Sequence, residues 1–441
     1  MRFENPDHPG RAVRLAYCLN LHPAEDLDGV LRGVREITLP LADELDPARD
    51  EGDFGLGAYL PGKVVLAMEG DDAEDRAAYV GFVAANGLDP FTYNAFPIGG
   101  FHHAGLKQGV FRPTWMETER QLFTWNVARV AADAWKACGA RSRHVSISTH
   151  TGMYAADVGG PADLDACADG LARMARTLAE IEQASGCRIV LSLEPEPGSN
   201  AGDARALAGF HERIRARARE VLGAGSDTVL RRHLGTCLDA CHAAVAFEHP
   251  QEAFLDATAD GTPLGKLQFT SAISLRHPDG NDAGRERLFG LEEPVYLHQV
   301  TGRRGGDVAQ AADLPEARRL WKSGAVGWRG CEEWRCHFHV PVDMGDLGDL
   351  GDGDRSGPAG GLGTTRAVAD EILAVALSDP ERWGTEELHV EIETYTWDVL
   401  PSEVRGTDSL VAGLAREYRH VLERMEAAGW TRARSGAAKS P

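Results

Sequence analysis

The sequence lacks both a long apolar run and an ordered framework of cysteines. No stretch of about eighteen consecutive apolar residues occurs in its 441 residues, so a membrane-spanning helix is not expected. The first residues, Met1 to Asn5, hold no apolar segment of the kind found in signal peptides, so we expect a cytoplasmic protein. The cysteines are scattered, and the closest pair, Cys237 and Cys241, does not have CxxC spacing. In a cytoplasmic chain such cysteines are expected to be reduced thiols.

Positive charge is scarce relative to negative charge. The chain has 46 Lys and Arg against 67 Asp and Glu, which gives a net charge of −21 at pH 7. A protein that grips a nucleic-acid backbone needs clustered cations, so we expect no nucleic-acid partner and favour a small molecule. The densest basic run is bracketed by Glu212 and Glu220, which predicts a solvated helix face. Its members are Arg213, Arg215, Arg217 and Arg219.

The chain has no internal repeat apart from an alternation of strand-like and helix-like segments. The strand-like runs are Ala12–Asn20, Phe54–Leu60, Pro90–Ile98, His144–Thr149, Arg188–Leu193, His233–Leu238, Leu264–Thr270 and Leu388–Thr394. Helical patterns follow most of them, at Asp26–Leu45, Asp72–Asn86, Thr118–Cys138, Asp163–Ser185, Asp203–Val221, Pro250–Ala257 and Asp408–Ala428. This alternation predicts parallel strands joined by crossover helices. The predicted fold class is therefore α/β, with a (β/α)8 TIM barrel as the natural architecture.

The length beyond a minimal barrel is concentrated between the seventh and eighth units. Residues 271–387 hold further strand-like and helical patterns, at Val295–Val300, Trp334–Val340, Leu314–Ser323 and Thr364–Leu377. A tract rich in Gly and Asp at 345–357 lacks the spaced ligands and final Glu of an EF-hand, so we expect a flexible surface loop over 344–362. We predict one domain over residues 1–430 that contains this insertion, followed by a disordered tail over 431–441.

Ionisable side chains recur at the downstream ends of the strand-like runs. The clusters are Glu194 and Glu196, Asp239 and His242, Lys266 and Gln268, His337 and His339, and Glu391 and Glu393. A core does not favour so many ionisable groups, and in a parallel barrel the chemistry lies at the carboxyl ends of the strands. Side chains two apart on a strand point to the same side, so each strand pair can face one pocket. Carboxylates with one or two imidazoles suit Mn²⁺, Mg²⁺ or Co²⁺, and further imidazoles favour Zn²⁺.

These positions resemble the metal-binding strands of the xylose isomerase-like TIM barrel superfamily, through Leu193-Glu194-Pro195, Asp239-x-x-His242 and Ile392-Glu393-Thr394. That superfamily includes sugar isomerases, ketose 3-epimerases, inosose dehydratases and endonuclease IV-type enzymes. Five further motifs carry a closer resemblance: LAYCLNLHP (15–23), NAFPIGGFH (94–102), LEPEPG (193–198), HFHVP (337–341) and EIETYTWDVLP (391–401). They are similar to the bacterial metabolite traffic protein family EboE, whose operon type implies a cyclitol or modified sugar.

The superfamily resemblance implies a metal site. Glu194 matches the strand-five glutamate, Asp239 the strand-six aspartate and Glu393 the strand-eight glutamate. The strand-seven position, usually His, is Gln268, whose amide oxygen is a poorer ligand. His339 in the insertion, or its neighbour His337, would supply the missing imidazole. Mn²⁺ is the expected metal, with Zn²⁺, Co²⁺ and Mg²⁺ as alternatives.

The same resemblance implies a divalent-metal-dependent isomerase or epimerase that acts on a sugar, cyclitol or sugar phosphate in secondary metabolism. The metal would acidify the C–H beside a carbonyl, and Glu194 and Glu393 would form the acid–base pair. Lys266 would supply a catalytic point charge, although a buried structural ion pair with Glu391 is the alternative. Substrate contacts are expected from Glu196, His242, His337, Glu391, His150 and Trp397, and Trp115 and Phe101 would help to wall off the pocket.

Two other functions stay open. The first is a metal-dependent phosphoester hydrolase like the endonuclease IV branch, in which Asp239-x-x-His242 and His337-x-His339 would hold two or three zinc ions. The acidic net charge speaks against DNA as its substrate. The second is a non-catalytic protein that binds or hands over a small metabolite, which Gln268 at the usual His position favours. Metal content distinguishes the three functions.

Overall fold

The computed structural model describes residues 1–46, 54–70, 73–100, 106–347, 361–397, 400 and 409–433. In this part of the chain a 10-stranded sheet runs in the order β15-β1-β2-β14-β8-β7-β6-β5-β4-β3. From β2 to β3 all neighbouring strands pair in parallel. These parallel strands are β2 (Ala12–Tyr17), β3 (Phe54–Tyr59), β4 (Leu88–Asn94), β5 (Val145–His150), β6 (Ile189–Glu194), β7 (Leu234–Asp239), β8 (Leu264–Phe269) and β14 (Glu387–Ile392). The prediction of an α/β fold with these eight strands is confirmed.

The parallel strands are buried along their whole length. Parallel strands covered on both faces read as near-continuous apolar runs, which is why they could be located from the sequence. The largest shift is in β4, predicted to continue to Ile98 but ending at Asn94. The two ends of the parallel series also meet, because an isolated parallel bridge joins Cys18, just after β2, to Gly57 in β3.

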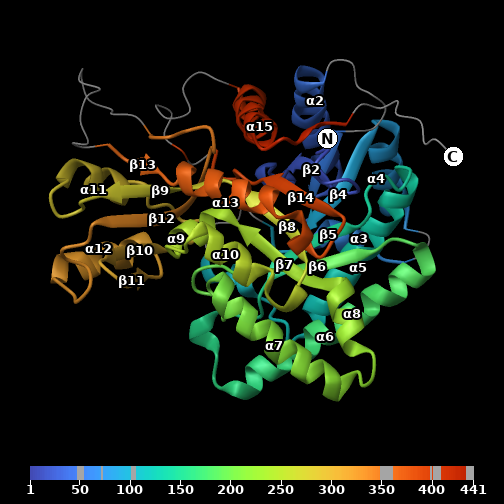
Figure 1. The fold of residues 1–441 in the computed structure, drawn as a ribbon, viewed down its shortest axis with the longest axis horizontal. Helices are drawn as coiled ribbons and strands as arrows, with labels where there is room; N and C mark the ends of the chain where they lie inside the picture. Colours follow the sequence, from blue (N-terminus) through green and yellow to red (C-terminus); the bar gives the residue numbers. More distant parts are fainter. Residues whose placement is uncertain are drawn as a thin grey trace.

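Helices surround the parallel strands, with α6, α7 and α8 on one side and α2 and α15 on another (Figure 1). The α-helices of the main unit are α1 (Leu27–Gly33), α2 (Leu39–Leu45), α3 (Gly62–Ala67), α4 (Glu74–Ala85), α5 (Thr118–Ala137), α6 (Pro161–Ser185), α7 (Ala204–Val221), α8 (Ser226–His233), α9 (Ala240–Val245), α10 (Pro250–Ala257), α13 (Arg366–Ser378) and α15 (Leu410–Ala427). The helix predicted over Asp26–Leu45 is divided by a π-helical segment, η2 (Val34–Thr38), just before Pro40, which has no backbone N–H to donate. Short 3-10 turns are η1 (Leu19–Leu21), η3 (Lys107–Phe111), η4 (Ala155–Asp157), η5 (Ala259–Gly261) and η6 (Pro380–Trp383).

A second, antiparallel sheet lies between β8 and β14 in the sequence and beside the main sheet in space (Figure 1). Its strand order is β11 (Asp307–Ala311), β10 (Val300–Arg304), β12 (Glu333–Val340), β9 (Ser271–Arg276) and β13 (Gly363–Thr364). Helices α11 (Asp282–Phe289) and α12 (Leu314–Ser323) accompany it. The sheet has its own apolar cluster, centred on Leu275, Trp334 and Phe338. The predictions of a strand at Trp334–Val340, a helix at Leu314–Ser323 and a helix near Thr364–Leu377 are confirmed.

The strand predicted at Val295–Val300 is wrong, because β10 begins only at Val300. The physical reason is that side chains occupy the backbone N–H groups a strand would use. Glu293 accepts hydrogen bonds from the N–H of Val295 (2.8 Å) and of Tyr296 (2.6 Å). Such local side-chain acceptors compete with a ladder, and the alternation of apolar residues does not reveal them.

Some predictions about segment ends need correction. The predicted tail begins too early, because Thr431 and Arg432 form β15 and pair with β1 (Arg2–Glu4). Residues 434–441, most of the Gly- and Asp-rich tract, and Phe101 lie outside the described residues. No helix in the described ranges is long and apolar enough to cross a membrane.

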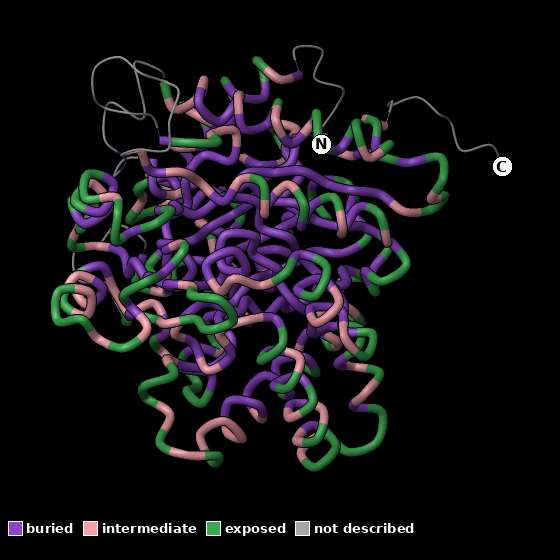
Figure 2. The backbone as a smooth tube through the Cα atoms, turned by 60° about the vertical axis from the view of Figure 1, so that its left-hand side comes forward, coloured by how far each residue is buried: buried purple, intermediate pink, exposed green. Residues whose placement is uncertain are grey.

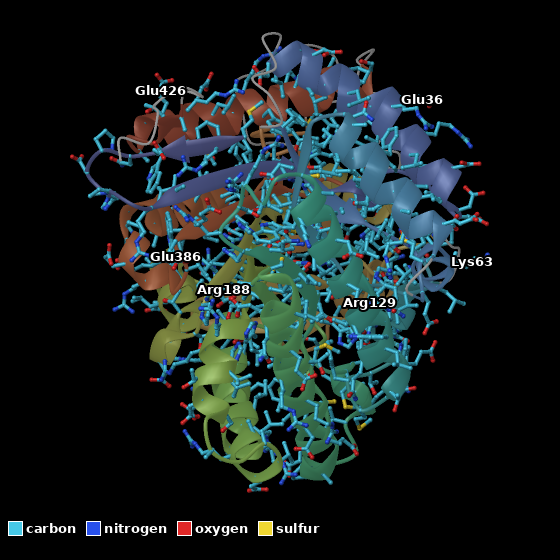
Figure 3. The ribbon with its side chains drawn as sticks, turned by 90° about the vertical axis from the view of Figure 1, so that its right-hand side faces the viewer. Glu36, Lys63, Arg129, Arg188, Glu386 and Glu426 are labelled. Carbon is cyan, nitrogen blue, oxygen red and sulfur yellow. The ribbon has the colours of Figure 1, made fainter. Side chains whose placement is uncertain are left out.

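Buried residues fill the middle of the molecule, and exposed residues lie toward its periphery (Figure 2). Each arginine of the basic run on α7 pairs with an aspartate, which fits the predicted solvated face. Figure 3 shows Arg188 and Glu386 close together, where they form an ion pair of 3.4 Å. These two residues precede β6 and β14, so they mark the amino ends of the parallel strands. The predicted site lies at the opposite ends.

Candidate metal centre and active site

Three predicted carboxylate ligands meet at the carboxyl ends of the parallel strands. Glu194 ends β6, Asp239 ends β7 and Glu393 directly follows β14. Each offers an oxygen within 4.8 Å of the others, and at most 4% of any of these residues is exposed. Glu194 Oε2, Asp239 Oδ2 and Glu393 Oε2 have no hydrogen-bond partner among the described residues. Buried oxygens without donors are costly, so this donor set fits a divalent cation.

The second oxygen of two of these carboxylates is fixed by the protein. Asp239 Oδ1 accepts hydrogen bonds from the backbone N–H of Cys241 (2.6 Å) and of His242 (3.0 Å), which makes it the N-cap of α9. Glu393 Oε1 accepts from Asn20 Nδ2 at 2.7 Å. Each carboxylate is thus oriented by one oxygen and leaves the other for a cation. Asn20 was not predicted to belong to the site. It ends the first strand-like run, so its position at the carboxyl end of a strand could have indicated it.

The carboxyl pKa values agree with an unsatisfied anionic cluster. Burial raises the pKa of Glu194 and of Glu393 well above the ordinary value, and the neighbouring carboxylates raise it further. Burial also raises the pKa of Asp239, against a lowering effect of His339. Groups this close hold protons unless a cation replaces them.

Three histidines form a second cluster beside the carboxylates. His242 lies in α9, and His337 and His339 lie on one face of β12 in the antiparallel sheet. The Nε2 atoms are 3.1 Å apart between His242 and His337, 3.0 Å between His337 and His339, and 3.4 Å between His339 and His242. Burial lowers the pKa of His242 to about 3 and that of His339 to about 4, so both rings are neutral. Asp239 offers an oxygen within 4.8 Å of His242 and His339, so it adjoins both clusters.

A pocket opens between the two clusters. Its lining combines ionisable residues with an apolar wall, and comprises Phe96, Pro97, Leu106, Val110, Glu194, Glu196, His242, Tyr296, Leu297, His337, His339, Glu393 and Tyr395. The predicted substrate residues Glu196, His242 and His337 are among them. Burial raises the pKa of Glu196 to about 8, against the hydrogen bond from Gln299. Gln299 was not predicted, and its position in a loop before β10 gave no signal in the sequence.

Lys266 and Glu391 form the buried ion pair that was the alternative to a catalytic lysine. Lys266 Nζ lies 2.8 Å from Glu391 Oε2, and neither side chain is exposed. Lys266 also donates to Asn94 Oδ1 (3.2 Å) and Ser148 Oγ (3.3 Å). Neither Lys266 nor Glu391 lines the pocket. The predicted catalytic role of Lys266 and substrate role of Glu391 therefore gain no support.

Three other predicted residues are also engaged elsewhere. Gln268 Oε1 accepts from Cys237 Sγ (2.9 Å) and its Nε2 donates to Asn94, so its role as a metal ligand gains no support. His150 uses both ring nitrogens on backbone groups, accepting from Gly152 N at Nδ1 and donating from Nε2 to Pro113 O. Trp397 donates its indole N–H to Glu417 at 3.2 Å. A substrate contact from either His150 or Trp397 would require these bonds to break.

A third group, His144, Glu387 and His389, lies near the amino ends of the strands. The two imidazoles are stacked, with ring centroids 4.0 Å apart and an angle of 5° between the ring planes. The lone pairs of parallel rings point in parallel directions, so they do not converge on one ion. Glu387 is already paired with Arg14 at 3.0 Å. This group is therefore a core packing arrangement rather than a metal centre.

Gly57 gives a test of the packing around the ion pair. A Cβ at this position would overlap Glu391 Oε1 and lie 2.6 Å from Tyr17 O. We expect Gly57→Ala to lower the free energy of unfolding by about 1–3 kcal/mol, because the crowded core must shift. Gly209→Ala in α7 is the matched control, because nothing lies within 4 Å of the added Cβ, and it should stabilise by about 1 kcal/mol. Urea denaturation of both variants measures the difference, and equal effects would contradict the predicted crowding.

His211, buried in α7 away from the pocket, predicts a pH dependence of stability. Burial, and next the charge of Arg215, lower its pKa from 6.5 to about 3. Below pH 6.5 the unfolded chain binds a proton that the folded chain does not, so stability is lost as the pH falls. Relative to His211→Gln, the wild type should lose about 3 kcal/mol between about pH 6.5 and pH 4. Urea denaturation across this range measures it, and parallel curves for the two proteins would refute it.

Comparisons with known proteins find matches in structure but none in sequence. No family model and no curated protein matches the chain. An L-ribulose 3-epimerase structure is similar at 12% identity and a TM-score of 0.44, covering 94% of this chain and 95% of that chain. The 3-keto-D-glucoside 4-epimerase of E. coli is similar at 15% identity and a TM-score of 0.32, covering 56% of this chain and 75% of that chain. Both are sugar epimerases, and the resemblance to EboE gains no support. Both identities are at most 15% and both TM-scores are below 0.5, so the function proposed next depends on the geometry of the site.

Proposed function

We propose that this chain is a divalent-metal-dependent isomerase or epimerase that acts on a sugar, cyclitol or sugar phosphate. The observation that carries the proposal is the set of three buried carboxylates, Glu194, Asp239 and Glu393, whose unpartnered oxygens cluster beside a pocket. Carboxylate oxygens, with the His339 imidazole nearby, suit Mn²⁺ first and Co²⁺, Zn²⁺ or Mg²⁺ next. We also propose that this reaction belongs to secondary metabolism.

The proposed architecture is a closed (β/α)8 barrel in one domain, with the antiparallel sheet as part of an insertion over 271–387. The bridge between Cys18 and Gly57 supports closure, because it joins the first and second strands of the parallel series. The pocket supports a single domain, because its lining comes from both sheets. In a barrel of this type the carboxyl ends of the strands carry the active site.

The positions of the residues in the pocket suggest their roles in this reaction. When bound, a divalent cation would chelate substrate oxygens and acidify the C–H beside a carbonyl. Glu194 and Glu393 come from β6 and from the segment after β14, which β7 and β8 separate in the sheet, and both line the pocket. One carboxylate accepts the proton from carbon, and the other, in its acid form, returns a proton from another side. Glu196, which also lines the pocket, would contact the substrate hydroxyl groups.

Proton exchange tests the reaction class directly. Mn²⁺-loaded protein is incubated in D₂O with a panel of ketoses, inososes and their phosphates, and deuterium incorporation is followed by mass spectrometry. We expect one substrate to gain deuterium at the carbon beside the carbonyl. An absence of exchange with every substrate and every divalent metal would reject the isomerase and epimerase.

Asp239 provides the test of the metal site. Asp239→Asn keeps the cap on α9 but removes the charge, so we expect bound metal to fall from near one ion per carboxylate site to a small fraction of that. Asp203→Asn is the matched control, because Asp203 also caps a helix, α7, through its side chain but does not line the pocket. Inductively coupled plasma mass spectrometry after loading and desalting measures the metal. Equal metal in the two variants would exclude Asp239 as a ligand.

A second candidate function is hydrolysis of a phosphoester, and one observation favours it. The three imidazoles lie beside the carboxylate cluster, so the two clusters together provide ligands for more than one ion, as a hydrolase with several metals requires. Hydrolysis of a chromogenic phosphodiester by the zinc-loaded protein, without deuterium exchange in any sugar, would favour this function. A chain that binds no metal would instead fit a metabolite-binding protein.

A further inference from the structure

The three imidazoles described above point at one another. Their Nε2 atoms form a triangle with sides of 3.0, 3.1 and 3.4 Å. All three residues are at least 96% buried, so solvent does not separate these nitrogens. Whether these nitrogens can bind a cation depends on which ring nitrogen of each histidine carries the proton.

The hydrogen-bond partners of the other ring nitrogens fix the protons. His242 Nδ1 faces Pro195 O at 3.1 Å, and His339 Nδ1 faces Glu393 O at 2.8 Å. A carbonyl oxygen only accepts, so each Nδ1 carries the proton and donates it. The third ring, His337, obeys the same rule through the side chain of Gln299.

His337 Nδ1 lies 2.5 Å from Gln299 Oε1. The orientation of the Gln299 amide is not arbitrary, because its Nε2 donates to Pro197 O at 2.7 Å. The oxygen therefore faces His337 and accepts its Nδ1 proton. All three Nδ1 atoms are protonated, so in the neutral rings all three Nε2 atoms present lone pairs to the centre of the triangle.

Three converging lone pairs repel one another unless a cation lies between them. One shared proton would satisfy only one pair of nitrogens and leave the third without a donor. A metal ion satisfies all three, and nitrogens at about 2.0–2.1 Å from a tetrahedral zinc lie roughly 3.3 Å from one another. The observed sides match this separation. Each Nδ1 donation to an oxygen is also the arrangement that orients an imidazole ligand.

We infer that His242, His337 and His339 bind a zinc ion at a site separate from the carboxylate cation. The fourth position is open toward the pocket, which all three imidazoles line, and Asp239 Oδ2 is the adjacent donor without a partner. This assignment replaces the predicted substrate role of His242 and His337. It also removes His339 from the carboxylate site. It does not depend on the reaction proposed above.

The ion would also link the two sheets. His242 follows β7 of the main sheet, whereas His337 and His339 belong to β12 of the antiparallel sheet. Protein contacts already join these parts, since Arg335 in β12 donates to Ala244 O in α9 at 2.7 Å. A zinc ion would add three bonds between these parts, in the wall of the pocket. The site is thus a clamp that fixes the antiparallel sheet over the carboxylates.

Metal counting with matched variants tests the site. Wild type, His337→Gln, Glu194→Gln and the control His211→Gln are loaded with Zn²⁺, desalted and analysed by mass spectrometry. We expect His337→Gln to lose one zinc per chain, Glu194→Gln to keep that zinc, and His211→Gln to match wild type. Equal zinc in His337→Gln and wild type would overturn the assignment. If only Glu194→Gln loses zinc, the result supports the carboxylate site and contradicts the imidazole site. The two proposals can therefore be rejected independently of each other.

Cobalt gives a readout of geometry that needs no catalysis. Co²⁺ in the imidazole site should give the intense visible absorption of a tetrahedral ion, present in Glu194→Gln and absent in His337→Gln. A weak octahedral spectrum in Glu194→Gln would overturn the site. If His337→Gln does not fold, Gln299→Ala replaces it, and we expect its zinc affinity to fall by about 10–100-fold in a chelator competition. An unchanged affinity would contradict the assigned ring protons.

Hydrogen exchange tests the clamp. We expect zinc to slow amide exchange in β12 and α9 of wild type by at least about tenfold relative to the chelated protein, and to leave His337→Gln unchanged. Exchange that is equal with and without zinc in wild type would overturn the link between the sheets.

Discussion

Replacing Glu393 with Gln is expected to reduce turnover by about 10³-fold while the protein stays folded. The amide cannot accept a proton from carbon, and removal of a general acid or base typically costs about 10²–10⁴-fold. Its size is unchanged, and Asn20 Nδ2 can still donate to the remaining carbonyl oxygen. The variant also removes one of three clustered buried charges, so stability should not fall. Steady-state kinetics on the substrate found by deuterium exchange, with thermal unfolding alongside, measure both effects.

The control for this variant is Glu386→Gln. Glu386 precedes β14 as Glu393 follows it, but it lies at the other end of the strand and is largely exposed. Metal content must be measured in both variants, because Glu393 is also a proposed ligand. Lost turnover with retained metal would assign the proton transfer to Glu393, whereas wild-type turnover would exclude it from catalysis.

Replacing Lys266 with Met is expected to lower the free energy of unfolding by about 3–5 kcal/mol. The change leaves Glu391 buried without its cation, and an uncompensated buried charge is strongly destabilising. The double variant Lys266→Met with Glu391→Gln should recover a large part of the loss, because no charge then remains in the interior. Urea denaturation of the single and double variants gives the coupling between the two residues.

The exposed pair Lys63 and Glu25 serves as the control for this prediction. Its atoms are 3.9 Å apart with both side chains mostly in solvent, so Lys63→Met should change stability by less than about 0.5 kcal/mol. A Lys266→Met variant of wild-type stability that had lost turnover would restore the catalytic role predicted from the sequence. Lost stability without a specific loss of turnover per folded molecule would keep the ion pair structural.

The strands were predictable because burial on both faces leaves a long apolar signature. The same signature placed Glu194, Asp239 and Glu393 at strand ends, and the structure brings them together. The alternation rule also placed His337 and His339 on one face of their strand. These inferences need only the local periodicity of the chain, which is why they survive without knowledge of the tertiary fold.

Depth along the strand could not be predicted in the same way. Lys266 and Gln268 point inward as expected, yet they lie below the pocket, where Asn94 bonds to both of them. Similarly, His242 is 95 positions from His337, and only the packing of α9 against β12 brings their rings together. The donors Asn20 and Gln299 depend on loop conformation. Such contacts are set by tertiary packing, so periodicity carries no information about them.

The antiparallel sheet described above is not a removable module. Its strand β12 carries His337 and His339, and the loop before β10 contributes Tyr296, Leu297 and Gln299 around the same pocket. Removal of the antiparallel sheet to obtain a minimal scaffold would therefore delete part of the pocket lining, so the scaffold alone would not carry the proposed function. Selection acting on the pocket must constrain both sheets together.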